Sequence, residues 1–289
     1  MSAKVNTKEF IEKKADCLII PYIVSCIFVI LAYILVYVIW GYQARRDLLG
    51  WLIVSLYGAG TNMVPPLDKI GYIGATWFLL ALFWALCVVR CCIDKKYPFL
   101  IICIISYIGY FTSKAIWIPF SVQAGLFATF YVYIGYITRQ KNLLNISLNV
   151  VETLFLLSIV MWEVVFYNGL FMSYCFLGNS LMDVLASLCA CFLVMRVCKM
   201  ISKHQIFSTI LSWYGRNSLI VLIFHVIEQN IVPYQLIHTN FFPDVRGWMF
   251  WIIVIIIKFV WVTMGIIIVR KLSLLNKVLN GYISVFKRI

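Results

Sequence analysis

The sequence predicts an all-α fold: a polytopic transmembrane helical bundle of about eight spans together with one re-entrant or interfacial segment. Hydrophobic residues occupy 64% of the 289 positions and charged residues only 12%, whereas an average soluble domain carries about 25% charged residues. The mean hydropathy of +0.97 is more than a soluble fold of this length could bury. The composition therefore excludes a soluble enzyme and predicts a single membrane domain over residues 1–289.

Eight apolar runs follow a polar N-terminal segment, residues 1–17, which is too charged for a signal peptide and shows no cleavage site. We expect this segment to lie in the cytoplasm. Most of the runs approach the ~20 residues that a helix needs to cross ~30 Å of hydrocarbon. The predicted spans are residues 18–40, 74–91, 98–113, 117–137, 146–167, 176–195, 207–232 and 248–269.

Two of these regions contain helix-breaking residues. Residues 51–73, WLIVSLYGAGTNMVPPLDKIGYI, hold several glycines and the pair Pro65-Pro66, which oppose a straight helix and favour a re-entrant or interfacial segment. The seventh run is interrupted by the polar sequence YGRN at residues 214–217.

The basic residues predict the orientation of the helices. With the N-terminus in the cytoplasm and eight alternating spans, 18 of the 24 Lys and Arg are cytoplasmic, five lie on the opposite face, and Lys258 lies within a span. Cytoplasmic loops of membrane proteins carry such an excess of positive charge. We therefore expect both termini, including the tail 270–289, in the cytoplasm, and we attribute the net charge of +13 to membrane sorting and not to a nucleic-acid partner.

The seventh span carries the polar group that most suggests chemistry. His225 lies nine residues beyond Arg216, which is ~13 Å along a helix and near the middle of the membrane. Glu228 and Gln229 follow at helical spacing and Ser218 precedes by seven residues, so the four predict one polar stripe that faces the bundle. An imidazole beside a carboxylate suits general-base catalysis, and it equally suits a structural hydrogen bond between helices.

Other ionisable residues lie at membrane depth. The fifth span carries Glu152 and Glu163, the sixth carries Asp183, and the eighth carries Lys258 near its centre. A lysine at that depth needs an acidic partner or a hydrated cavity. Glu163, Asp183 and Glu228 are the available acids, and a structural salt bridge is the simplest interpretation.

Three segments together resemble acyltransferase family 3, a family of integral membrane O-acyltransferases. The segment FIEKKADCLIIPY resembles the family's basic helix with Leu-Ile-Pro-Tyr, and ATWFLLALFW resembles its Trp-Phe-Leu span. The segment GRNSLIVLIFHVIEQN is similar to the family's Gly-Arg-Asn-Ser-Leu helix with a histidine, especially in members like fucose 4-O-acetylases. The segment IPFSVQAGLFATFYVYIGYITRQ also fits, and the resemblance covers residues 10–232.

The sequence departs from the family pattern in two places. The resemblance implies that two helices precede the basic helix in the family, and the first of them carries a histidine thought to be catalytic. That histidine has no counterpart here, so a truncated or inactive member is one expectation. Many members also show Pro-Trp-Ser-x-Asp where this chain has PFSVQ at residues 119–123, and Gln123 cannot act as a base.

The resemblance implies that an acetyl group moves from acetyl-CoA, a donor substrate on the cytoplasmic side, to a hydroxyl of a cell-surface glycan or its lipid-linked precursor. No tightly bound cofactor is expected, and no metal, because the ten cysteines show no CxxC pair or Cys/His spacing. The candidate residues are His225 and Glu228 for catalysis, Arg216, Asn217 and Ser218 for the donor, and Arg45, Arg46 and Trp77 for the acceptor.

Two other classes of function remain open at this point. Inward-facing acids and Lys258 also suit a transporter or flippase for a polysaccharide precursor, although such proteins commonly show inverted repeats and none is visible here. A catalytically dead structural membrane partner is the third hypothesis.

The orientation predicts which side of the membrane the C-terminal tail occupies. In intact cells, a cysteine introduced by Lys277→Cys should not react with a membrane-impermeant thiol reagent. It should react once the membrane is permeabilised. The parent protein, treated in the same way, gives the background labelling of the native cysteines. Labelling of the variant in intact cells would mean that the orientation is inverted.

Overall fold

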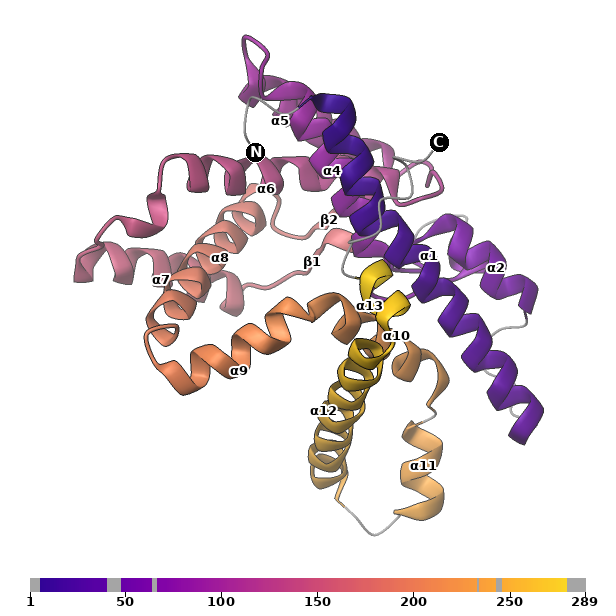
Figure 1. Ribbon diagram of the computed structural model, residues 1–289. Coiled ribbons are helices and arrows are strands. Elements are labelled where there is room, and N and C mark those ends of the chain that lie inside the picture. Colours follow the sequence, from indigo (N-terminus) through magenta and orange to yellow (C-terminus); the bar gives the residue numbers. More distant parts are fainter. Residues whose placement is uncertain (1–5, 41–47, 64–66, 233, 243–245, 280–289) are drawn as a thin grey trace.

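The computed structural model describes residues 6–40, 48–63, 67–232, 234–242 and 246–279, and the fold in this part of the chain is almost entirely helical (Figure 1). The helices are α1 (Thr7–Trp40), α2 (Leu48–Tyr57), α3 (Leu67–Ile70), α4 (Trp77–Cys92), α5 (Pro98–Thr112), α6 (Val122–Gln140), α7 (Val150–Val165), α8 (Leu181–Ile201), α9 (Gln205–Arg216), α10 (Ser218–Ile231), α11 (Tyr234–Phe241), α12 (Gly247–Lys271) and α13 (Ser273–Leu279), with the short 3-10 turns η1 (Leu143–Asn145) and η2 (Met172–Tyr174). Between α7 and α8, the two-residue strands β1 (Leu170–Phe171) and β2 (Phe176–Leu177) pair antiparallel.

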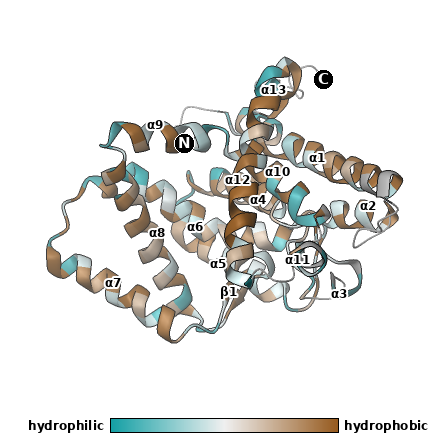
Figure 2. Ribbon diagram, turned by 90° about the horizontal axis from the view of Figure 1, so that it is seen from below, coloured by the Kyte–Doolittle hydropathy of each residue, from teal (hydrophilic) through white to brown (hydrophobic). Residues whose placement is uncertain are grey.

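The membrane class predicted from the sequence is confirmed. Among the described residues, α1, α8 and α12 are long and apolar enough to cross a membrane, and α9 with α10 is a fourth candidate if this bent pair forms one span. Figure 2 shows α12 as an almost continuously hydrophobic helix. The other predicted spans form helices of 15 to 19 residues, or about 23 to 29 Å, so the number of eight crossings stays a prediction.

Three groups of helices make up the fold. The helices α4, α5 and α6 pack together, and α1 packs on α4. On its other side α1 contacts α10, which in turn packs against α12. The helices α7 and α8 form a hairpin that projects to one side of the molecule, and α9 leads from this hairpin back to α10 (Figure 1).

The polar N-terminal segment is largely helical. The helix α1 begins at Thr7, so eleven residues of the segment extend the first predicted span instead of forming a separate tail. Ala15 on this part of α1 is buried with Phe83 and Cys87 of α4. The segment is therefore anchored to the bundle by apolar contact.

The segment predicted to be re-entrant is broken, as its glycines suggested. The helix α2 has ten residues, or about 15 Å, which is half the thickness of the hydrocarbon core. Gly58 ends this helix with a φ of +59°, and a Cβ there would collide with Leu80 of α4. The Tyr22 hydroxyl of α1 also donates to the Ser55 carbonyl, at 2.5 Å. Pro65-Pro66 fall outside the described residues.

The start of α6 fastens this broken segment to the bundle. The Ser121 hydroxyl donates to the carbonyl of Gly58 at the end of α2. The fully buried Gln123 side chain accepts a hydrogen bond from the Ile118 amide, at 3.0 Å, and donates one to the Ile116 carbonyl, at 2.7 Å. Gln123 thus provides hydrogen-bond partners for two backbone groups in the loop before α6, which have no partners within a helix.

The α7–α8 hairpin is held at its ends by polar groups. The Asn149 side chain accepts a hydrogen bond from the Glu152 amide, and the Glu152 carboxylate accepts one from the Asn149 amide, at 2.8 and 2.9 Å. This reciprocal pair is a capping box at the N-terminus of α7. At the end of α8, the Lys199 ammonium donates to the Asn145 side chain, at 2.5 Å. Glu152 therefore has a structural role.

The Gln123 hydrogen bonds predict a stability effect. Gln123→Leu leaves the Ile116 carbonyl and the Ile118 amide without their partner in a partly buried site, at up to about 1–3 kcal/mol each. We expect the variant to unfold at a lower temperature than the parent in detergent. Gln205→Leu, at an exposed position on α9, is the matched control. Equal melting temperatures for the two variants would mean that the loop does not depend on Gln123.

Candidate functional site

The predicted seventh span is two helices joined at a sharp break. The axes of α9 and α10 differ by 67°, and the break lies at Asn217, whose backbone leaves the helical region at φ −106° and ψ 15°. The buried Asn217 side chain donates to the Trp213 carbonyl, at 2.7 Å. The Tyr214 hydroxyl hydrogen-bonds to Thr263 of α12, at 2.7 Å. The break thus sets the direction in which α10 runs along α12.

A close helix crossing brings α10 against α12. A Cβ added to Gly265 would approach the Phe224 ring to 2.5 Å, so a larger residue there would push the helices apart. Next to this contact, the Trp261 indole donates to the Phe224 carbonyl, at 3.0 Å. Apolar residues of both helices continue the contact, including Ile223 and Ile266, which are fully buried. The crossing places the next residues of α10 opposite the middle of α12.

At this position three ionisable side chains meet. The Glu228 carboxylate, 4% exposed, lies with Oε2 at 3.4 Å from His225 Nδ1 and with Oε1 at 3.2 Å from Lys258 Nζ. His225 and Glu228 are one turn apart on α10, and Lys258 comes from α12. Lys258 is 29% exposed and His225 42%, so the imidazole can be reached from outside the helix pair. We call these three residues the Glu228 cluster.

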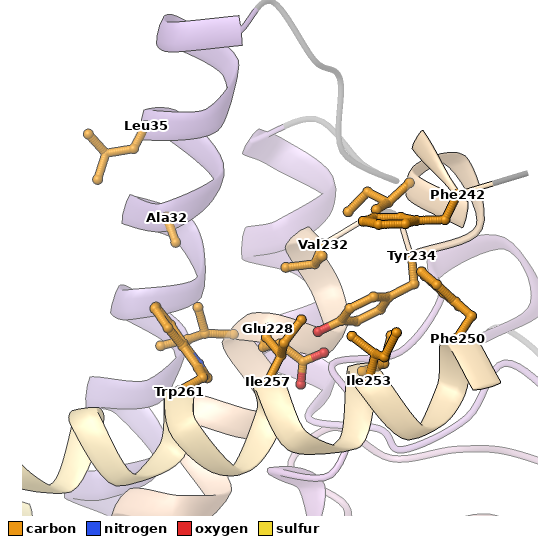
Figure 3. A pocket seen from close by; sticks show the side chains of 13 residues that line it. Ala32, Leu35, Glu228, Val232, Tyr234, Phe242, Phe250, Ile253, Ile257 and Trp261 are labelled. Carbon is orange, nitrogen blue, oxygen red and sulfur yellow. The ribbon is translucent and has the colours of Figure 1, made fainter. Parts of the chain in front are cut away.

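Tyr234 of α11 lies next to the Glu228 cluster. Its hydroxyl points toward the Glu228 carboxylate (Figure 3), and the Lys258 ammonium lies 5.0 Å from the centre of its ring. The carboxylate and the tyrosine line a cavity of about 410 Å³ between α1, α10, α11 and α12. His225 and Lys258 line a second cavity, of about 220 Å³, between α10 and α12.

The other two candidate acids lie elsewhere. Glu163 of α7 and Asp183 of α8 line a separate cavity of about 450 Å³ in the hairpin. The Asp183 carboxylate accepts a hydrogen bond from the Asn179 amide, at 2.8 Å. Of the three acids that the sequence offered, Glu228 is therefore the one paired with Lys258. Within the described part of the chain, no three His, Cys, Asp or Glu side chains gather as a metal site requires.

The predicted polar stripe on α10 is narrower than expected. Ser218 and Gln229 are exposed, whereas Glu228 is buried against α12, so the expectation that all four residues face the bundle is wrong. Gln229 follows Glu228 by one position, and the 100° step of a helix turns it away from the partner helix. His225 and Glu228 remain together.

The residues predicted to meet the donor lie at the other end of α10. Ser218 is seven residues before His225, or about 10 Å along the helix. Arg216 and Ser218 are exposed, while the Asn217 amide is used in the helix break. Their contact with a donor stays a prediction.

Of the residues predicted to meet the acceptor, the structure describes Trp77, which is not part of the Glu228 cluster. Trp77 is half-buried at the start of α4 and packs closely against Gly60, where a Cβ would overlap its ring. Such packing accounts for the indole without an acceptor. Arg45 and Arg46 lie outside the described residues. The sequence analysis did not single out Tyr234, because it falls in a segment that was expected to be a loop.

Comparison with known proteins decides the family. The family model of acyltransferase family 3, described as an acyltransferase domain, matches residues 2–270. The chain belongs to acyltransferase family 3. No curated protein and no solved structure matches this acyltransferase significantly. Membership supports an integral membrane protein whose general activity is acyl transfer.

The Glu228 cluster has the parts that acyl transfer uses. The Glu228 carboxylate beside Nδ1 orients the imidazole of His225, which leaves the opposite ring nitrogen, Nε2, to take a proton from a hydroxyl. The Lys258 ammonium balances the carboxylate charge at membrane depth. Because His225 lines a cavity and is partly exposed while Glu228 is 4% exposed, the imidazole is accessible and the carboxylate beside it is held between the helices.

The ion pair predicts a measurable coupling. Lys258→Met leaves the Glu228 carboxylate buried without a cation, which costs up to about 3–5 kcal/mol. Adding Glu228→Gln removes that charge, so the double variant should be more stable than Lys258→Met alone. Thermal unfolding of the parent, both single variants and the double variant measures the coupling. Additive effects would show that the two side chains do not interact.

Proposed function

We propose that this acyltransferase moves an acetyl group from acetyl-CoA to a hydroxyl of a cell-surface glycan or its lipid-linked precursor. Membership of acyltransferase family 3 supports the reaction class, since the family model covers residues 2–270. The observation that carries the assignment to a site is the accessible His225 imidazole, held 3.4 Å from a buried carboxylate.

In the proposed reaction, His225 acts as the general base. Its Nε2 takes the proton of the acceptor hydroxyl while the oxygen attacks the acetyl carbonyl carbon of the thioester. The carbon–sulfur bond then breaks, the ester forms, and the sulfur leaves with the proton that the imidazolium returns. Glu228 stabilises the imidazolium during this step, as the carboxylate of a catalytic triad does.

Lys258 supports the reaction by its charge. It lines the same 220 Å³ cavity as His225, and a fixed ammonium in a site with little water stabilises the oxyanion that develops on the carbonyl oxygen. Exposed Arg216, at the end of α9 where the pair bends, provides positive charge for the phosphates of acetyl-CoA. The predicted orientation places this end of α10 on the cytoplasmic side, where the donor is found.

The test is acetyl transfer by purified protein in lipid nanodiscs. With acetyl-CoA labelled in the acetyl group and a lipid-linked oligosaccharide as acceptor, His225→Ala should lower the transfer rate by at least about a hundredfold, the contribution of a general base. Glu228→Gln, which keeps the shape of the side chain, should lower kcat more than it raises KM.

Two measurements separate catalysis from folding. Gln229→Ala, beside Glu228 but exposed, is the matched control and should transfer acetyl groups at the parental rate. Thermal unfolding of each variant in detergent shows whether the helix pair is intact. Full transfer by a folded His225→Ala variant, or no transfer by the parent, contradicts the proposal.

A further inference from the structure

The cavity beside Glu228 is lined mainly by apolar side chains. It has a volume of about 410 Å³, within the range of ligand sites in proteins. Its walls come from α1, α10, α11 and α12, and they include Leu35, Ile253 and Ile257 (Figure 3). The indole N–H of Trp261, which also lines it, is already used by a backbone carbonyl. The remaining polar groups of the lining residues are the Glu228 carboxylate and the Tyr234 hydroxyl.

The cavity lies where lipid is the solvent. Two of its walls, α1 and α12, are helices long and apolar enough to cross the membrane. Leu35 is 59% exposed and Ile257 54%, so apolar side chains continue from the cavity to the outer faces of both helices. A hydrocarbon chain can therefore enter sideways from the bilayer without crossing water, and it gains van der Waals contacts with the cavity walls.

The polar groups of the wall lie together, next to the separate cavity that the candidate base lines. The Tyr234 hydroxyl points at the Glu228 carboxylate (Figure 3), and His225 Nδ1 is 3.4 Å from the same carboxylate. A molecule whose tail occupies the cavity would bring its polar end to this point. The hydroxyl closest to the tail would then lie beside the Glu228 cluster.

We propose that this cavity binds the hydrocarbon tail of a lipid-linked sugar acceptor, so that acetyl transfer takes place on the sugar next to the lipid. This inference rests on the proposed function and names the acceptor class of the same site. A CoA donor fits the cavity less well, because none of its lining residues is basic and the phosphates of CoA need cations. For the same reason, the acceptor that suits this cavity is one whose sugar is joined to the tail without a phosphate. The second cavity, which His225 and Lys258 line and Glu228 does not, is left for the acetyl thioester.

The test uses a long-chain alkyl glycoside that carries a diazirine at the end of its tail. The full-length protein is placed in phosphatidylcholine nanodiscs with this probe, irradiated and digested, and the labelled peptides are identified by mass spectrometry. We expect label on the peptides of α1 and α12 that line the cavity. Because phospholipid is in excess, competition by the same glycoside without diazirine shows recognition of the glycoside and not of bulk lipid.

Two adjacent positions on α12 give a matched pair of variants. Ile253 lines the cavity and Ile252 does not, and their side chains are 43% and 49% exposed. Ile253→Trp fills the cavity and should remove most of the competed label, because the larger side chain takes the space of the tail. Ile252→Trp should leave the label unchanged.

The results distinguish this inference from the proposed function. Absence of competed label on the wild-type protein, equal loss in both variants, or competition by a long-chain acyl-CoA but not by the glycoside overturns the tail site. If acetyl transfer to a soluble sugar persists in that case, the proposed function stands alone. Competed label that responds to Ile253→Trp in a protein without transfer activity supports the tail site and removes the proposed function.

Discussion

A carboxylate buried between two membrane helices is stable only when a cation lies beside it, and in this acyltransferase Lys258 provides that cation for Glu228, at 3.2 Å. Neither charge could occupy its position alone, because hydrocarbon offers no water to replace the missing partner. The pair therefore ties α10 to α12 at one register. It also determines the position of His225, which is one turn from Glu228 on the same helix.

The contacts around this ion pair are arranged to keep the two helices close. Gly265 lets the Phe224 ring lie directly on α12, and the bend at Asn217 turns α10 out of the line of α9. Helix association in lipid depends on such close packing because lipid tails are as apolar as the helix faces. As a result, two separate cavities form: Glu228 lines one, and His225 and Lys258 line the other.

Several polar residues that could be interpreted as catalytic groups form hydrogen bonds with the backbone instead. Gln123, which replaces the acid of the family pattern, holds two backbone groups of the loop before α6. Glu152 caps α7, and Asn217 donates to a carbonyl at the helix break. Each occurs where a helix begins or ends, since those are the places where backbone groups lack helical partners and lipid provides none.

The sequence by itself determined the membrane class, the positions of the apolar helices and the short list of ionisable residues at depth. Composition and run length suffice for the first two because hydrocarbon imposes a strict rule on backbone hydrogen bonds. Local spacing also placed His225 and Glu228 on neighbouring turns, and the need of a buried lysine for an acid limited the partners of Lys258 to three candidates.

The tertiary structure decided which of those acids is the partner, and it separated Ser218 and Gln229 from the stripe predicted on α10. It also brought Tyr234 to the carboxylate from a segment with no motif, and it bent the seventh predicted span by 67°. Helical periodicity relates residues within a turn or two, whereas these outcomes depend on the angle at which α10 crosses α12. That angle is set by contacts such as Gly265 with Phe224, between residues far apart in the chain, and no local pattern contains it.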